Sequence, residues 1–262
     1  MSHISFSEFK NWITCPFYHK LVHVDKIKSF RGNEYTAFGT AIHEVCERSV
    51  LSKKDVLDPV KIFVEKFNEE IESLKNEMTI SEETKNTMTS QAKTIIPSIL
   101  PKLEEYFGEY EVVSTEEDLY LPINFFDKQK YNFKGFIDLV LKTSYGKYHV
   151  IDWKSCSWGW DRKKRSDKIL SYQLTFYKYF FAQKHNIDPK KIETHFALLK
   201  RTAKSNNVEI FRVTSGNKKT NNALNLLTKA LYNISNKNYI KNRTSCHNSW
   251  GPCEFYKTKY CK

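Results

Sequence analysis

YNFKGFIDLVLKT (residues 131–143) and KYHVIDWKS (residues 147–155) are the two stretches that decide the fold. Both are rich in β-branched and aromatic residues, which is typical of strands. The dipeptide Tyr145-Gly146 marks a turn between them. The sequence therefore predicts two strands that are consecutive along the chain and adjacent in one sheet.

Strands and helices are also predicted on both sides of this pair. Further strands are expected at 111–123, 193–201 and 208–214. Helices are expected from Ser5 or Ser7 to Cys15, at 36–51, from Asp58-Pro59, from Ser81 to Tyr106 with a kink at Pro97 or Pro101, at 167–185 and at 217–235. This order predicts a single mixed α/β domain over residues 1–262, with residues 55–107 as a helical insertion.

Composition narrows the function classes. The chain has 262 residues and a formal net charge of +12, which favours a polyanionic partner, nucleic acid first and an anionic membrane second. No apolar run is long enough to cross a bilayer, and MSHISFSEFK has no secretory core, so a cytoplasmic location is expected. Six cysteines are too few for a disulfide scaffold and point to metal binding or buried thiols.

The two central strands carry the residues with the clearest chemistry. Asp138 and Asp152 lie on adjacent predicted strands, which can bring their carboxylates close together. Such a pair is unfavourable unless a proton or cation relieves it, and Mg²⁺ or Mn²⁺ does so while binding phosphate oxygen. Lys154 shares a face with Asp152 and can orient water and offset charge on the phosphate.

Two helical motifs complete the pattern. In Gly39-x-x-x-His43-x-x-x-Glu47 the last two side chains share a helix face, as do those of Gln173-x-x-x-Tyr177. An imidazole such as that of His43 near the carboxylates would favour Mn²⁺ over Mg²⁺.

Together these pieces resemble the PD-(D/E)xK nucleases, and within them the RecB-type branch, over roughly residues 36–180. Ile137 stands at the proline position of the family name. The resemblance implies a restriction-endonuclease-like mixed sheet flanked by helices. It also implies metal ligation by His43, Asp138, Asp152 and the carbonyl of Trp153, catalysis by Lys154, an orienting Gln173, Tyr177 along the DNA path, and Glu47 beside the metal.

The cysteines extend the resemblance. One cysteine before the nuclease motifs and three after them resemble an iron–sulfur subgroup that includes the AddB nuclease and CRISPR-associated exonucleases. The implied cluster is [4Fe–4S], stapling residues 1–20 to residues 240–262. Its ligands would be Cys15, Cys246, Cys253 and Cys261. Six and then seven residues separate the last three cysteines, against the family's two and five, so structural Zn²⁺ and unligated thiols remain alternatives.

A third set of residues follows the second central strand. Trp158 and Trp160 precede the basic run Arg162, Lys163, Lys164 and Arg165. These residues either contact nucleic acid, by stacking and by binding phosphate, or form a packed aromatic loop beside solvated charges.

The predicted function is a metal-dependent DNA nuclease, an exonuclease on single-stranded ends in recombination, repair or phage-type DNA processing. The alternatives are an inactive DNA-binding module of the same fold and an RNA- or structure-specific endonuclease. The sequence has no GxxxxGK[ST] motif for unwinding duplexes, so a separate helicase or recombinase partner is expected.

Overall fold

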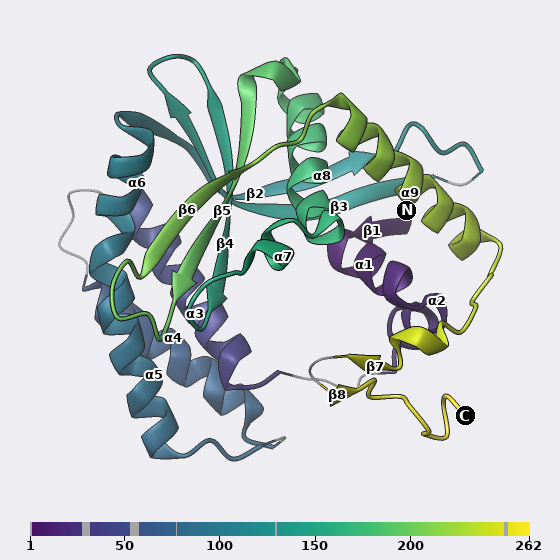
Figure 1. Ribbon diagram of the computed structural model, residues 1–262, viewed down its shortest axis with the longest axis horizontal. Coiled ribbons are helices and arrows are strands. Elements are labelled where there is room, and N and C mark those ends of the chain that lie inside the picture. The colour runs from purple at the N-terminus through teal and green to yellow at the C-terminus, as the bar shows by residue number, and fades with distance from the viewer. Residues whose placement is uncertain (1, 28–31, 53–57, 77, 129, 249–250) are drawn as a thin grey trace. The chain divides into compact units, whose positions relative to one another are not determined.

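The chain divides into two compact units in a computed structural model (Figure 1). Unit 1 comprises Met1–Arg31, Leu119–Gly135 and Gly216–Lys262, and unit 2 comprises Gly32–Asp118 and Phe136–Ser215. The structure describes residues 2–27, 32–52, 58–76, 78–128, 130–248 and 251–262. Residues 55–57 and 77 of the predicted helical insertion, and residues 1 and 249–250 of the predicted cluster-binding ends, lie outside the described residues.

A mixed sheet organises unit 2. The end of β3 (Tyr131–Thr143) pairs antiparallel with β4 (Tyr148–Cys156), which pairs parallel with β5 (Ile192–Lys200). β6 (Val208–Val213) returns antiparallel to β5. β2 (Tyr110–Pro122) pairs with β3, and both of these strands continue from one unit into the other.

Four helices cover one face of β4, β5 and β6 (Figure 1). They are α3 (Glu34–Leu51), α4 (Pro59–Leu74), α5 (Glu82–Ile95) and α6 (Ile99–Phe107). Side-chain caps from Asn33, Asp58 and Ser81 start the first three, because their oxygens accept otherwise unbonded backbone N–H groups. A 3₁₀ turn at Ile96–Ser98, containing Pro97, separates α5 from α6, which confirms the kink predicted there.

The alternation of β4 assigns its side chains to two faces. Ile151 and Trp153 belong to the apolar core formed with the four helices. The even-numbered residues point to the opposite face, where α8 (Lys168–His185) packs on β4 and β5. Two short elements flank α8, namely α7 (Arg162–Arg165) and a 3₁₀ turn at Pro189–Lys191. Asp152 and Lys154 are therefore fixed on the α8 face of a rigid strand.

Unit 1 holds the two ends of the described chain. β1 (Ser2–Ser5) pairs parallel with residues 131–134 of β3, and Ser5 caps α1 (Phe6–Thr14). α1 is followed by α2 (Pro16–His19) and a π-helix (Lys20–Val24), and it contacts α9 (Asn217–Ser235). The remaining elements are a 3₁₀ turn (Arg243–Ser245) and the small hairpin of β7 (His247–Asn248) and β8 (Gly251–Pro252).

A mixed α/β fold with a mixed sheet flanked by helices confirms the fold class expected from the sequence. The organisation as a single domain stays a prediction. No helix among the described residues is long and apolar enough to cross a membrane.

Candidate metal centre

Asp152 is the most deeply buried carboxylate of the candidate site. It is 1 % exposed because it lies in the middle of the sheet, on β4 between β3 and β5. Its Oδ2 lies 2.6 Å from Nζ of Lys154, two residues along the same face. The Lys154 ammonium is therefore the charge that offsets this buried carboxylate.

Asp138 on β3 lies beside the backbone of β4. Its Oδ2 accepts a 2.6 Å hydrogen bond from the amide of Trp153, and Nδ1 of His43 lies 3.7 Å from the same oxygen. His43 comes from α3, and its imidazole also hydrogen-bonds the backbone of Trp153. The distant helix α3 and the consecutive strands β3 and β4 therefore bring an imidazole, two carboxylates and a strand backbone to one place.

The pKa values of these groups follow from their burial. Desolvation raises the pKa of Asp138 to about 7 and that of Asp152 to about 6, although Lys154 opposes both shifts. Desolvation also lowers the pKa of His43 to about 4, against the attraction of Asp152. The imidazole is therefore neutral at neutral pH, as a metal ligand must be.

Gln173 and Tyr177 of α8 approach the same carboxylate from the helix side. Nε2 of Gln173 donates to Oδ1 of Asp152 at 2.8 Å and contacts the hydroxyl oxygen of Tyr177 at 3.0 Å. Tyr177 is buried, and desolvation together with the charge of Asp152 raises its pKa above the ordinary value. Gln173 thus contacts Asp152 directly.

Glu47 faces β2 one helical turn beyond His43. It accepts a 3.2 Å hydrogen bond from the hydroxyl of Thr115. The next residue, Glu116, has a left-handed φ of 46°, and burial and the charges of Glu47 and Glu44 raise its pKa. The charge of Glu116 also raises the pKa of Asp138.

Glu116 escaped the sequence analysis because it lies in the acidic run Glu116-Glu117-Asp118, which is typical of a solvated strand face. The left-handed backbone of Glu116 is visible only in the structure, because no sequence motif predicts it.

The loop after β4 separates the two predicted tryptophans. Trp160 is 7 % exposed and packs against Phe196 and Phe211, whereas Trp158 is 78 % exposed. The basic run forms the exposed helix α7, whose four residues are of two kinds. Arg165 pairs with Glu209 at 2.6 Å and donates to the carbonyl of Trp160, and Nζ of Lys164 lies 4.9 Å from the Trp160 ring. Arg162, Lys163 and Lys164 are exposed, whereas Arg165 is half-buried.

In unit 1 the four predicted cluster cysteines line one pocket of about 330 Å³. They are Cys15, Cys246, Cys253 and Cys261, and none forms a disulfide. No three of their sulfurs lie within 4.8 Å of one another. The amide of Asn242 donates to Sγ of Cys15 at 3.3 Å. The other two cysteines are in unit 2, Cys46 fully buried in α3 and Cys156 at the end of β4.

The sequence matches the model of the PD-(D/E)XK nuclease superfamily over residues 3–260. The chain therefore belongs to the PD-(D/E)XK nuclease superfamily. Membership implies a nuclease, that is, a hydrolase that acts on nucleic acid, and nucleases of this superfamily use Mg²⁺ or Mn²⁺.

Among solved structures, the chain is similar to the crystal structure of SSO0001, with a TM-score of 0.34 and 16 % identity over 87 % of this chain and 85 % of that one. None of the curated proteins matches the sequence.

The residues of the candidate centre fit a divalent cation. Two carboxylates, a neutral imidazole and the Trp153 backbone converge, and the ammonium of Lys154 lies 2.6 Å from the buried carboxylate of Asp152. These donors match the preferences of Mn²⁺ and Mg²⁺.

Proposed function

We propose that this protein is a metal-dependent deoxyribonuclease that removes nucleotides from single-stranded DNA ends, as an exonuclease of the RecB-type branch. The observation that carries the proposal is the convergence of His43, Asp138 and Lys154 on the buried carboxylate of Asp152. Its proposed setting is the cytoplasm, in recombination, repair or phage-type DNA processing, with a helicase or recombinase supplying single strands.

In this proposal each side chain has one task. Asp138, Asp152, His43 and the carbonyl of Trp153 hold the cation, which supplies Lewis-acid activation of water and phosphate when bound. Lys154 donates hydrogen bonds from its ammonium to the attacking water and to the phosphate oxygen, where negative charge grows. Gln173 is a positioning residue, because its hydrogen bond fixes the carboxylate plane of Asp152.

Residues near this set are assigned by their contacts. Glu47 and Glu116 surround the centre with further negative charge, which favours cation entry. We assign Tyr177 to orienting Gln173 at the edge of the DNA path. For DNA contact we propose Trp158, Arg162, Lys163 and Lys164, which are exposed. Trp160 and Arg165 hold this loop in place, since Trp160 packs against Phe196 and Arg165 forms an ion pair with Glu209.

We further propose a [4Fe–4S] cluster on Cys15, Cys246, Cys253 and Cys261. A single Zn²⁺ would draw four sulfurs to within about 4 Å of one another, given Zn–S bonds near 2.3 Å. A four-iron cluster places metal atoms between the sulfurs and suits a wider arrangement around one pocket. Anaerobically purified protein should absorb near roughly 400 nm, and colourless protein with stoichiometric zinc would show that the zinc alternative is right.

The nuclease proposal is tested with Mn²⁺ or Mg²⁺ on end-labelled linear and circular DNA, single- and double-stranded, and on matched RNA. The wild type should shorten linear single strands and leave circles intact. Lys154→Ala should cut at least about a hundredfold more slowly, the range expected from losing one stabilising donor. Lys142→Ala, a lysine of the neighbouring strand β3 that lies over Tyr148, is the matched control and should cut normally.

Three outcomes would contradict the proposal. Cleavage of circles would indicate an endonuclease, and preferential cleavage of RNA would change the substrate. No cleavage of any substrate by the wild type would favour the inactive DNA-binding module.

A further inference from the structure

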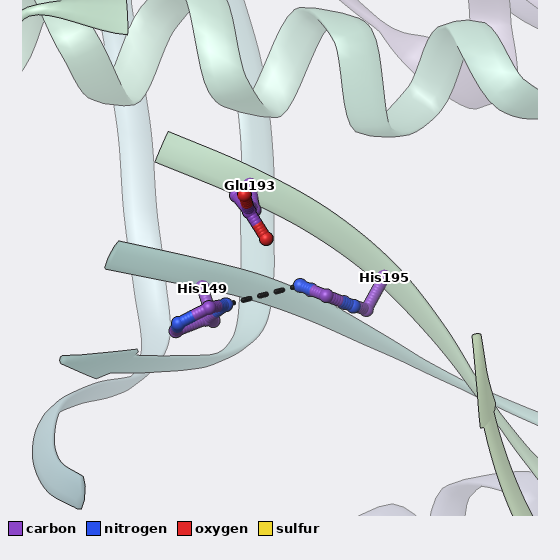
Figure 2. Close-up of side chains that lie close together, drawn as sticks. All are labelled: His149, Glu193 and His195. Atoms are coloured by element: carbon purple, nitrogen blue, oxygen red, sulfur yellow. Dashed lines mark hydrogen bonds between the residues drawn. The ribbon is translucent and has the colours of Figure 1, made fainter. Parts of the chain in front are cut away.

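His149, Glu193 and His195 form a second group of metal-ligating side chains, apart from the candidate centre. His149 lies on β4 and the other two on β5, where the parallel register pairs His149 with Glu193 and Ile151 with His195 (Figure 2). Because side chains alternate along a strand, His149 points to the face of β4 opposite to Asp152. The nuclease chemistry uses none of these three residues.

The distances within this group suit a single ion. One ligand atom of each residue lies within 4.8 Å of the others. Nδ1 of His149 and Nε2 of His195 are 3.1 Å apart and form a hydrogen bond, which an ion bound between them would replace after the shared proton leaves (Figure 2). Two nitrogens bound to one tetrahedral zinc at about 2.0–2.1 Å would be roughly 3.4 Å apart, so a small rotation of the rings admits the ion.

The protein holds both imidazoles in a form that can ligate. Burial lowers the pKa of His149 below its usual value and that of His195 to about 3, with Arg212 acting in the same direction. The rings of Phe107 and Tyr106 pack against them. Nδ1 of His195 is buried and has no hydrogen-bond partner among the described residues.

The outer nitrogen of His149 already has a neighbour. Oγ1 of Thr143 lies 3.5 Å from its Nε2, where a ligating histidine normally donates its second N–H.

Cations around the group oppose metal binding. Arg212 pairs with Glu193 at 3.2 Å, and the charges of Lys147 and Lys178 also act on this region. The Arg212 side chain is 55 % exposed, so it can turn into solvent when Glu193 takes another partner. Arg212 therefore competes with a metal ion for one carboxylate.

We propose that His149, Glu193 and His195 form a second metal site, of the zinc class, that cross-links strands β4 and β5. Two imidazoles and one carboxylate are a zinc ligand set that leaves a fourth position for water. The site tethers the strand that carries Asp152 and Lys154 to its neighbour.

The test uses Zn²⁺ itself as the probe, with zinc content and affinity measured after equilibrium dialysis. Glu193→Gln removes the charged ligand and should weaken one Zn²⁺ site at least about tenfold, the smallest loss typical of a disturbed metal shell. Arg212→Gln frees the carboxylate and should tighten the same site. Asp152→Asn changes a residue on the opposite face of β4 and should leave Zn²⁺ binding at this second site unchanged.

Anomalous scattering at the zinc edge from crystals of the wild type should place an ion between His149 and His195. The proposal would be overturned if wild type and Glu193→Gln held the same amount of zinc, or if Arg212→Gln weakened zinc binding as much as Glu193→Gln does. The absence of an anomalous peak at these residues would overturn it as well. The crystal and Arg212→Gln readouts decide the matter even if Glu193→Gln fails to fold.

Discussion

At the scale of single residues, the centre is built around charge that is costly when no metal is bound. Burial raises the pKa of the carboxyl groups of Asp138 and Asp152. When both groups are ionised, their mutual repulsion raises the free energy of the folded state further. Such a site loses stability in order to bind a cation tightly.

Asp138→Asn should therefore stabilise the metal-free protein at pH 8. The unfolded chain releases this proton near pH 3.8 and the folded chain near 7, so the group's contribution to stability falls as pH rises between these values. The shift corresponds to an upper limit of roughly 4 kcal/mol at pH 8. Thermal unfolding in EDTA should show a higher Tm for the variant at pH 8 and equal values at pH 4, because the wild-type carboxyl is then neutral in the folded state.

His43 titrates in the opposite direction, since its folded pKa is depressed to about 4. Its contribution is lost as pH falls from 6.5 towards 4 in both proteins and cancels in their difference. A Tm of the variant at or below that of the wild type at pH 8 would contradict the assigned burial cost.

Binding of Mn²⁺ should release protons, and more of them at pH 6 than at pH 8. The carboxyls of Asp138 and Asp152, with pKa values of about 7 and about 6, must ionise to ligate. Calorimetry in two buffers of different ionisation enthalpy measures this number directly. Equal proton release at both pH values would mean that the cation binds elsewhere.

At the scale of elements, the position of α8 affects the candidate metal centre through the hydrogen bond from Gln173 to Asp152. Its cap, Asp167, accepts from the amides of Ile169 and Leu170 at 2.8 and 3.1 Å. The helix then carries Gln173 to Asp152. The geometry of the cap should therefore affect catalysis as well as stability.

Asp167→Ala should cost roughly 0.5–2 kcal/mol of stability and lower the cleavage rate. Asp58→Ala is the matched control, because Asp58 caps α4 with two bonds of nearly the same length, to Val60 and Lys61. It should cost similar stability, read from urea unfolding, without slowing cleavage at a fixed saturating concentration of Mn²⁺. Equal slowing by both variants would indicate a general effect of destabilisation.

The elements also show what periodicity can predict. The helix expected at 217–235 agrees with α9, because its apolar spacing is a local signal. β1 was missed, since four residues are too few to show alternation and its pairing with β3 is long-range. Asp138, Asp152 and Lys154 could be located in advance because motif and strand coincide there. His149 and His195 are 46 residues apart and meet only through the parallel register of β4 and β5.

At the scale of the whole molecule, the chain distributes its chemistry over two units. The candidate metal centre belongs to unit 2, and the cysteine pocket to unit 1, which gathers both ends of the described chain. Cys15 is linked to the opposite end of the sequence by its contact with Asn242. Loss of the proposed cluster should therefore be felt first in unit 1.

Cys253→Ser should abolish the visible absorbance and make residues 240–262 sensitive to limited proteolysis, while fragments from unit 2 persist. Mass spectrometry of the fragments locates the cuts. Cys46→Ser, a cysteine buried outside the pocket, is the control and should keep the absorbance. Unchanged absorbance in Cys253→Ser would remove this residue from the ligand set.

The two faces of β4 also restrict which insertions and deletions the gene can tolerate. Asp152 and Lys154 face α8, while His149, Ile151 and Trp153 face the other helices. Gain or loss of one residue within the strand would exchange the faces of everything beyond it, and would bury Trp153 where the carboxylate belongs. Length variation near this strand should therefore be confined to the Tyr145-Gly146 turn, where Tyr145 is exposed, or occur in steps of two residues.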